Sequence, residues 1–332
     1  MIIQTQAHAR VGLIGNPSDG YFGKTISVIC RNFAARVTLY ESPRLTITPH
    51  ESDRSSFQGI GDLVNDVQRN GYYGGLRLIK AAIKRFHDYC NERGIELPPR
   101  NFTIEYHTDI PVRVGLAGSS AIVTAAIKAL MRFYGVEVEK PLLPNLVLSV
   151  ELDELGIGAG LQDRVIQVYE GAVFMDFDRR LFETRGYGEY EPLDPAKLPP
   201  LFAAARPRLA EGTEVPHNDL RGRFNRGEKQ VLDAIDRFAA LAQEARGLIN
   251  GGRGEEIGPL MDENFDLRAS IMHISEGNHQ LVQTGRKLGA SVKFAGSGGA
   301  VIGTYDGDPD RYQRLVEAYR GIDADVFVPE VT

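Results

Sequence analysis

The feature that most constrains this chain is a glycine-rich segment about one third of the way along it. Residues 111–121 read PVRVGLAGSSA; a strand-like alternation precedes them, and a helical stripe of apolar residues follows at 121–134. Small residues let backbone N–H groups approach phosphate oxygens closely, and the N-terminus of the following helix adds positive potential. A strand, a glycine-rich loop and a helix in this order therefore predict a phosphate-binding loop.

The residues of this loop have separate expected roles. Ser119 and Ser120 can cap the helix, and one of the two hydroxyls can also reach a metal ion carried by the phosphates. A loop that only caps a helix is the alternative for this segment taken alone, because glycine-rich loops are common. The segment is neither a Walker A loop, since no Gly-Lys-Ser/Thr follows, nor a dinucleotide-binding fingerprint. The residues expected at the phosphates are Gly115, Leu116, Ala117, Gly118, Ser119, Ser120 and Ala121.

Length, charge and cysteine content narrow the class of protein. A chain of 332 residues favours two domains. Its formal net charge of −6 argues against nucleic acid or an anionic membrane as the main partner. Cys30 and Cys90 have no CxxC spacing, which excludes a cysteine-rich zinc site and a disulfide framework and fits a reducing cytoplasm. The N-terminus lacks signal-peptide features, and no apolar run reaches the ~18 residues of a membrane helix, so we expect a cytoplasmic protein.

The periodicity of apolar residues predicts a mixed chain with a boundary beyond its middle. Strands are expected at 11–15, 25–29, 35–40, 45–48, 101–106 and 172–176, and helices at 76–90, 121–134, 144–155 and 161–169. The stretch 178–200 is rich in proline, glycine and charge, so the domains are expected to span 1–185 and 186–332. Beyond it, the pattern predicts a strand at 201–205, a polar loop, helices at 227–249 and 277–288, and a strand–turn–strand at 291–303.

Two further glycine-bearing segments change the interpretation of the loop. Residues 9–20 read ARVGLIGNPSDG, and residues 293–300 read KFAGSGGA. With the loop at 111–121, they resemble the three signature motifs of the GHMP kinases, in the same order and at matching spacing over nearly the whole chain. The resemblance implies ATP and Mg²⁺ as cofactors and an α+β fold of two domains. The N-terminal domain would have the ribosomal S5 domain 2-like fold and the C-terminal domain a ferredoxin-like fold, with the active site in the cleft between them.

The resemblance also assigns catalytic roles. Asp163 stands at the position of the family's catalytic aspartate, where a carboxylate can accept or orient the proton of the attacking hydroxyl. Arg10 stands where related sugar kinases have an arginine facing this aspartate, and its charge would keep Asp163 ionised and offset charge on the transferred phosphoryl group. Glu151, twelve positions before Asp163, would hold Mg²⁺ together with Ser120.

The first and third motifs are expected to bind the substrate. Asp19 matches an aspartate that accepts hydrogen bonds from sugar hydroxyls. Asn16 occupies a position that is glutamate in galactokinases, and Pro17 replaces a histidine. This difference disfavours galactose, and it removes a carboxylate that would repel an anionic sugar. The residues that resemble the third motif, which would close over the site near the phosphates, are Gly296, Ser297, Gly298 and Gly299, and the first three of these are expected to contact the substrate.

Another segment points to one branch of the family. Residues 144–177, PNLVLSVELDELGIGAGLQDRVIQVYEGAVFMDF, resemble sugar-1-kinases that act on a uronic acid, which implies phosphorylation of D-glucuronate at its anomeric C1 oxygen. Galacturonate, galactose and a heptose are alternative substrates, and a catalytically silent sensor of sugar and ATP is the non-enzymatic alternative. A uronate carboxylate needs a partner, and arginine is the usual bidentate one. The arginines considered for this role are Arg113 and Arg221, which are preferred, and Arg164 and Arg223.

Each of these assignments also has a purely structural alternative. Glu151 and Glu154 could lie on the solvated face of a helix. Asp163 could stabilise only a helix N-terminus through the helix dipole, and Asp19 could serve only as a turn residue before glycine. The histidines show no metal-binding spacing and are expected to be surface or core residues.

Overall fold

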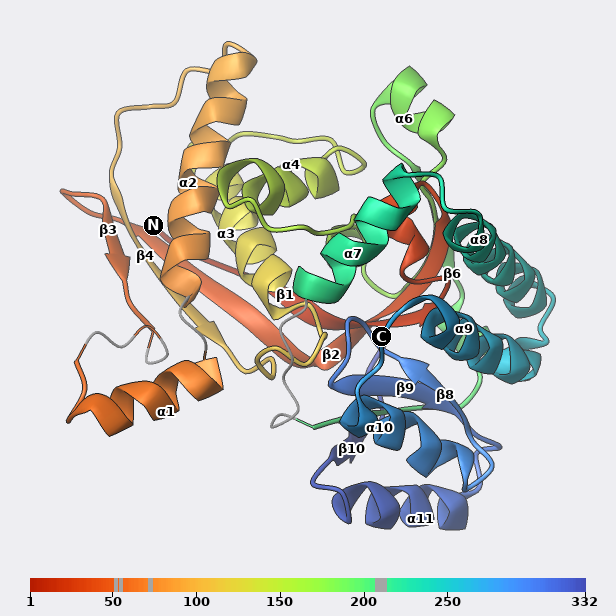
Figure 1. The fold of residues 1–332 in the computed structure, drawn as a ribbon. Helices are drawn as coiled ribbons and strands as arrows, with labels where there is room; N and C mark the ends of the chain where they lie inside the picture. Colours follow the sequence, from red (N-terminus) through yellow and green to blue (C-terminus); the bar gives the residue numbers. More distant parts are fainter. Residues whose placement is uncertain (51–52, 54–55, 71–73, 207–213) are drawn as a thin grey trace.

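A hairpin of two long strands forms the spine of the N-terminal half of the molecule (Figure 1). The computed structural model describes residues 1–50, 53, 56–70, 74–206 and 214–332, without the side chains of 66–70 and 214–218. Strand β1 (Ile2–Ile14) pairs antiparallel with β2 (Lys24–Glu41). The apolar pattern predicts two separate strands within β2. The structure joins them, and the polar break between them becomes a bulge opposite the middle of β1.

The burial of β1 changes along its length. Its outer half alternates between exposed and buried residues, as expected for a strand with one face in water, whereas residues 7–14 are all buried. The inner half is covered on both faces because helices from both halves of the chain pack on it. These are α3 (Gly118–Tyr134), α5 (Gln162–Tyr169), α8 (Lys229–Asn250) and α9 (Gly258–Ile271). The first glycine-bearing motif therefore lies in the interior, between the two halves.

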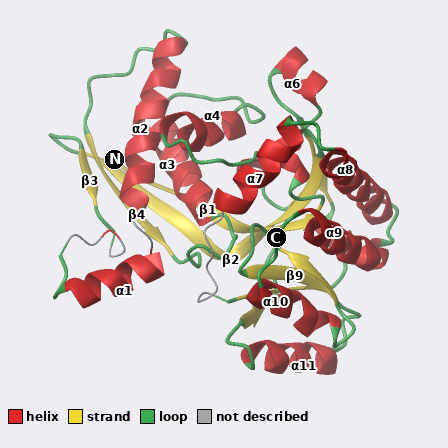
Figure 2. Cartoon of the chain, in the orientation of Figure 1, coloured by secondary structure: helices red, strands yellow, loops and turns green. Residues whose placement is uncertain are grey.

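Four further strands complete the first sheet, shown in yellow in Figure 2: β3 (Thr46–Thr48), β4 (Phe102–Thr108), β5 (Ala172–Asp176) and β6 (Glu189–Leu193). Strand β2 is long enough to pair antiparallel with β4 along its C-terminal half and with β5 along its N-terminal half. β3 adds parallel to β4 at one edge, and β6 adds antiparallel to β5 at the other. The order is β3-β4-β2-β5-β6, with β1 against β2.

Helices of the N-terminal half position the glycine-rich loop and the acidic residues. α2 (Gly75–Glu92) packs beside α3, and α4 (Leu143–Ser149) leads directly into a single π-helical turn, η3 (Val150–Glu154). The helix expected at 144–155 is therefore divided, and Glu151 lies on its π-helical part. Helix α1 (Ile60–Asn70), which the apolar pattern does not predict, lies apart from the others at one side of Figure 1.

The C-terminal half contains a second, antiparallel sheet in the order β10-β7-β9-β8. Its strands are β7 (Leu201–Ala205), β8 (Ser291–Phe294), β9 (Ala300–Thr304) and β10 (Asp325–Phe327). One face packs against α9, α10 (Glu276–Arg286) and α11 (Pro309–Arg320), and the residues of the other face join the main core. The α+β fold class is confirmed, and the two-domain description fits this arrangement.

The connection between the two sheets differs in part from the expectation. β6 belongs to the first sheet and β7 to the second, and the division at 185/186 stays a prediction. The polar loop expected after β7 is wrong for 214–225, which form α7 (Glu214–Asn225). Leu220 and Phe224, one helical turn apart, pack that helix against Tyr21 and α8. The remaining short elements are η1 (Ser18–Tyr21), α6 (Arg179–Arg185), η4 (Pro195–Lys197) and η6 (Gly254–Ile257).

Candidate active site

The three glycine-bearing segments meet at the inner end of β1. The backbone N–H of Arg10 donates to the carbonyl of Leu116 in the glycine-rich loop (3.2 Å). Two residues further along, the N–H of Gly12 donates to the carbonyl of Ala295 in the third segment (2.7 Å). The first motif thus lies between the other two and hydrogen bonds to each. Segments from opposite ends of the chain therefore form one site.

The glycine-rich loop leaves the start of α3 open to a ligand. The helix begins at Gly118, and its N-cap, Ala117, has a left-handed backbone with φ 63°. In the described structure no side chain caps this helix, so the expectation that Ser119 or Ser120 does so is wrong; both lie inside its first turn. The uncapped N–H groups and the helix dipole suit an anion. Ser119 is exposed, whereas Ser120 is buried and its Oγ donates to the carbonyl of Ala117 (3.1 Å).

The glycine-rich loop and the third segment touch through their backbones. Gly115 has φ 74°, and a Cβ on it would lie 2.9 Å from the backbone nitrogen of Ser297. A Cβ on Gly296 would lie 2.1 Å from the carbonyl oxygen of Gly115, closer than real side chains come. Gly298 has φ 137° and abuts the amide of Asn278. Both loops therefore need glycine for this approach.

Arg10 joins the predicted catalytic aspartate to both loops. Its Nε donates to Oδ1 of Asp163 (2.6 Å), and its Nη1 donates to the carbonyls of Gly115 (2.6 Å) and Ala295 (3.1 Å). Arg10 is 6% exposed, so these bonds form away from bulk water. Asp163 lies in the first turn of α5, where the helix dipole favours a negative charge. The pair places one carboxylate beside the glycine-rich loop, in a fixed orientation.

Glu151 forms a buried ion pair with Arg164. Arg164 Nη2 donates to Glu151 Oε2, and each side chain is only 4% exposed. Arg164 Nη1 donates to the carbonyl of Gly160 (2.8 Å) and lies 3.3 Å from Asp163 Oδ2. The alternative that Glu151 lies on a solvated face is therefore wrong. Arg164 connects both predicted functional carboxylates.

Asp19 lies close to Asp163 at the turn between β1 and β2. The backbone N–H of Gln162 donates to Asp19 Oδ2 (3.4 Å), and a Cβ on Gly160 would collide with that oxygen at 1.9 Å. Burial and the negative charge of Asp163 raise the pKa of Asp19 to about 6. The carboxylate thus sits in a site that disfavours its charge and that hydrogen-bond donors from a sugar would stabilise.

Replacing Asp19 by asparagine is expected to stabilise the free protein while weakening substrate binding. A carboxyl group whose pKa is higher in the folded than in the unfolded protein stabilises the native state when the pH is below its unfolded pKa. For Asp19 this contribution is lost as the pH rises through its folded pKa of about 6. The ionised group therefore costs up to about 3 kcal/mol near pH 7.5. Thermal unfolding should show a higher Tm for Asp19→Asn than for wild type at pH 7.5 and little difference at pH 4. A variant that is less stable at pH 7.5 would contradict this reading.

Two buried cations of the site are not singled out by the sequence. Lys293 is 1% exposed, and its Nζ donates to the side-chain oxygen of Asn16 (2.5 Å). Arg268, on α9, donates to the carbonyls of Gly296 (2.7 Å) and Ser297 (3.2 Å) and so holds the third motif. Burial lowers the pKa of Arg268 to about 10. Lys293 opens the third motif in sequence, which is the one signal that could have drawn attention to it.

The four arginines considered for a substrate carboxylate lie in different surroundings. Arg221 is exposed, and its guanidinium stacks 4.6 Å from the ring centroid of Tyr21, the residue that ends η1. Arg113 is also exposed, on the loop that leads into the phosphate site. Arg223 is held by Glu228 through two bonds (2.6 and 2.9 Å), and Arg164 is held by Glu151. Arg221 and Arg113 are therefore the two whose guanidinium groups face solvent near the site.

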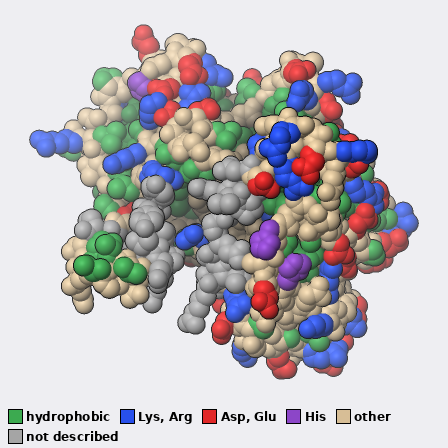
Figure 3. Space-filling model, viewed as in Figure 1, with side chains coloured by type: hydrophobic (Ala, Val, Ile, Leu, Met, Phe, Trp, Pro, Cys, Tyr) green, Lys and Arg blue, Asp and Glu red, His purple; other side chains and the backbone are tan. Residues whose placement is uncertain are grey.

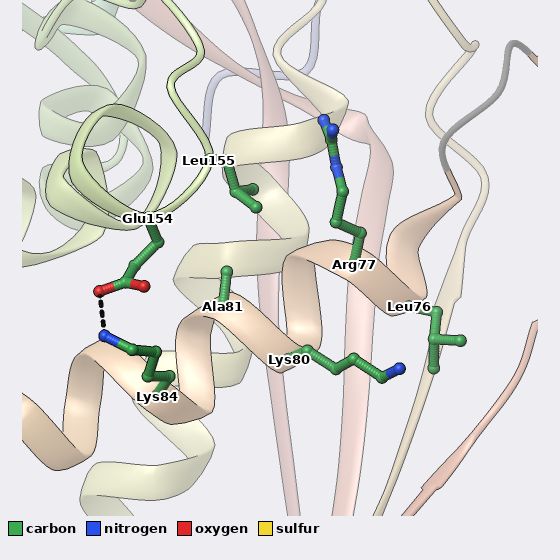
Figure 4. Close-up of a pocket in the computed structure, with 7 residues that line it drawn as sticks. All are labelled: Leu76, Arg77, Lys80, Ala81, Lys84, Glu154 and Leu155. Atoms are coloured by element: carbon green, nitrogen blue, oxygen red, sulfur yellow. Dashed lines mark hydrogen bonds and ion pairs between the residues drawn. The ribbon is translucent and has the colours of Figure 1, made fainter.

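A pocket of about 380 Å³ opens between α2 and η3 (Figure 4). Lys84 reaches across it to Glu154 (2.8 Å), three positions after Glu151 on the same π-helical turn. Leu155 and Ala81 give it an apolar wall. The lining is Leu76, Arg77, Lys80, Ala81, Lys84, Glu154 and Leu155. The pocket thus combines an apolar wall with three basic side chains, Arg77, Lys80 and Lys84.

The residues predicted for Mg²⁺ fit the way this ion is usually held. Among the residues described, no three His, Cys, Asp or Glu side chains gather as a metal site of their own. Mg²⁺ in kinases is typically bound by one or two protein oxygens together with phosphate oxygens, so a full protein cage is not required. Glu151 and Ser120 supply hard oxygen donors of the right type; in this structure Arg164 donates to Oε2 of Glu151, and Ser120 Oγ donates to the carbonyl of Ala117. Their role stays a prediction.

The surface in Figure 3 carries basic and acidic side chains mixed together. This distribution agrees with the modest net charge of −6. None of the helices in the described parts of the chain is long and apolar enough to span a lipid bilayer.

Known proteins resemble this chain in sequence and in fold. The family model of the GHMP kinases N-terminal domain matches residues 77–171, which include the glycine-rich loop, Glu151 and Asp163. The chain is 40% identical to glucuronokinase 1 of Arabidopsis thaliana over 96% of its own length and 89% of that protein. It is 41% identical to probable glucuronokinase 2 of the same plant over 96% and 88%.

A solved structure extends the likeness to the fold. Phosphomevalonate kinase of Streptococcus pneumoniae, in complex with phosphomevalonate and AMPPNP, superposes with a TM-score of 0.74 at 16% identity, covering 99% of this chain and all of that one. Three glycine-bearing loops that meet at one site, an N-terminal domain that matches the family model, and relatives of about 40% identity along nearly the whole chain agree with one another. The chain belongs to the GHMP kinase family.

Proposed function

We propose that this enzyme is a glucuronokinase, which transfers the γ-phosphoryl group of ATP to the anomeric C1 hydroxyl of D-glucuronate and yields glucuronate 1-phosphate and ADP. The observation that carries the substrate is the identity of 40% with a glucuronokinase over nearly the full length of both chains. The kinase chemistry is supported by the site itself. An arginine-bound carboxylate lies beside an uncapped helix N-terminus.

The geometry supports direct in-line transfer. Asp163 accepts the proton of the C1 hydroxyl, while the C1 oxygen forms a bond to the γ-phosphorus and the bond from that phosphorus to the β,γ-bridging oxygen breaks. Arg10 holds the carboxylate in place and offsets negative charge on the phosphoryl group. The N–H groups at the start of α3 bind the remaining phosphates. Mg²⁺, held by Glu151 and Ser120, would neutralise charge on the β- and γ-phosphates.

A substrate screen by ADP release tests this proposal. The purified enzyme with ATP and Mg²⁺ should turn over D-glucuronate faster than galacturonate, galactose, glucose or a heptose, and the product should be a 1-phosphate. Fast turnover of a neutral sugar without turnover of glucuronate would overturn the choice of substrate. Binding of sugar and ATP without turnover of any sugar would instead identify a sensor.

Arg221→Gln is expected to weaken binding of the substrate carboxylate. A charge-assisted, bidentate bond from an exposed arginine is worth about a tenfold change in affinity, so KM for D-glucuronate should rise about 10-fold while kcat changes little. Arg113→Gln is the matched comparison, because it removes the same charge from the other exposed candidate. If Arg113→Gln raises KM and Arg221→Gln does not, the carboxylate contact belongs to Arg113.

A further inference from the structure

Lys293 is a buried ammonium group whose partners carry no formal charge. Its Nζ donates to the carbonyls of Gly12 (2.9 Å) and Phe294 (2.8 Å) and to Asn16 Oδ1 (2.5 Å). Three oxygen acceptors match the three N–H bonds of an ammonium group. The other charges nearest to it are also positive. Arg268 from α9 and Arg10 from β1 act with burial to lower the pKa of Lys293 well below its usual range.

The bond from Lys293 fixes which way the amide of Asn16 points. Only the oxygen of the amide can face an ammonium donor, so Nδ2 must point the other way. In the described part of the chain, no hydrogen-bond partner receives this Nδ2. Asn16 as a whole is only 4% exposed, but Nδ2 is not one of its fully enclosed atoms, so a ligand can reach it. The backbone of Gly15 and Asn16 is also held in place by hydrogen bonds. Asn264 accepts from the N–H of Gly15 (2.6 Å) and donates to the carbonyl of Asn16 (3.0 Å).

The position of Asn16 places this amide beside residues that are predicted to bind the sugar. It lies on the turn that carries Asp19, three residues later, and its side chain lies 3.3 Å from the position that a Cβ on Gly12 would take. Burial next to two other cations favours the neutral amine of Lys293, whereas an anion bound beside it favours the ammonium form and offsets the cost of burying that charge. A ligand that accepts a hydrogen bond and carries a negative charge therefore complements Asn16 Nδ2 and the buried Lys293 better than a neutral ligand does.

We infer that Lys293 is a positioning residue for substrate selection: it turns Nδ2 of Asn16 toward the sugar and places a buried positive charge behind it. This pair then favours a sugar that ends in a carboxylate over one that ends in a hydroxymethyl group. The inference rests on the proposed function. It differs from the role given to Arg221, which would contact the carboxylate from the exposed side.

Asn16→Asp tests the inference without removing the lysine. The new carboxylate gives Lys293 a counter-ion and places a negative charge where the donor stood. The protein should fold with a Tm no lower than that of wild type. The kcat/KM for D-glucuronate should fall about 10- to 100-fold relative to that for D-glucose, as expected for charges ~6 Å apart at an effective dielectric of ~20. D-glucose shares every hydroxyl of the ring and differs only at C6.

D-glucuronamide, which carries a neutral amide at C6, separates charge from shape. Its kcat/KM should change less than threefold in Asn16→Asp. For a sugar that is not turned over, the inhibition constant against D-glucuronate takes the place of kcat/KM. Asn91→Asp, at an exposed position near the end of α2, adds the same charge far from the site and should leave all three sugars unaffected.

The possible outcomes separate this inference from the proposed function. If wild type does not turn over D-glucuronate, the proposed function is wrong. If wild type does so and folded Asn16→Asp keeps the wild-type ratio of glucuronate to glucose, the role of Lys293 and Asn16 is overturned. Lys293→Met should lose the same discrimination, but it leaves three acceptors without a donor and can reduce folding. The folded Asn16→Asp variant therefore tests the pair, and Lys293→Met protein that folds assigns the effect to the lysine.

Discussion

Asp163→Asn should lower kcat by about 10²- to 10⁴-fold, the range expected for the loss of a positioned general base. The substitution keeps the size of the side chain, and its amide oxygen can still accept the bond from Arg10 that holds Asp163 at 2.6 Å. The position of the group is thus preserved while its ability to take the hydroxyl proton is lost. KM for ATP should change little, because the phosphate loop is untouched.

The measurement pairs ADP release with calorimetric binding of D-glucuronate and an ATP analogue. Asp266→Asn provides a matched control, since Asp266 also pairs with an arginine, Arg286 (2.7 Å), but is exposed on α9. It should retain the wild-type rate. Wild-type turnover by Asp163→Asn, with unchanged binding, would show that Asp163 is not the base. A change confined to KM would assign it to substrate binding alone.

Glu151→Gln should destabilise the protein by about 3–5 kcal/mol, because removing one partner of a buried ion pair leaves the other charge uncompensated. Glu151 and Arg164 are each 4% exposed, so water cannot replace the lost carboxylate. The decrease in the free energy of unfolding should fall toward the lower end of this range. Asp163 Oδ2 remains 3.3 Å from Arg164 and still compensates part of its charge. Denaturant unfolding without Mg²⁺ measures this effect separately from catalysis.

Glu154→Gln is the control for this variant, on the same π-helical turn. Glu154 pairs with Lys84, which is 61% exposed, and surface pairs of this kind contribute about 0–1 kcal/mol. The second readout is the Mg²⁺ dependence of the rate. If Glu151 holds the metal, its variant should need a much higher Mg²⁺ concentration for half-maximal rate, and Glu154→Gln should not. An unchanged requirement in Glu151→Gln would leave Glu151 with a structural role only.

The glycine-rich segments could be found in the sequence because glycine is the residue type that meets their requirement, whether this is a backbone angle or the close approach of another segment. A backbone with φ 74° at Gly115, or a carbonyl 2.1 Å from a would-be Cβ at Gly296, admits little else. The roles of Asp163 and Arg10 followed from family resemblance, and the structure brings these two side chains together. Their catalytic roles remain predictions.

The parts that the sequence did not reveal depend on contacts between distant residues. α9 was missed because its buried face carries Asn264 and Arg268, which interrupt the apolar stripe that identifies a helix. α7 was missed because its apolar residues are few. The environment of Lys293 could not be predicted, since its decisive partner, Asn16, lies 277 positions away in the sequence. Likewise, the burial of Glu151 follows from Arg164, on another helix.

The position of β1 has a consequence for the solubility of the protein. Among the described strands it pairs only with β2, so its other side is a sheet edge, the kind of surface through which chains associate into aggregates. The inner part of that edge is used by the N–H groups of Arg10 and Gly12, which donate to Leu116 in the glycine-rich loop and to Ala295 in the third segment. The loops that are predicted to bind the substrates therefore also close this edge. Damage to either loop threatens the protein with self-association as well as with loss of activity.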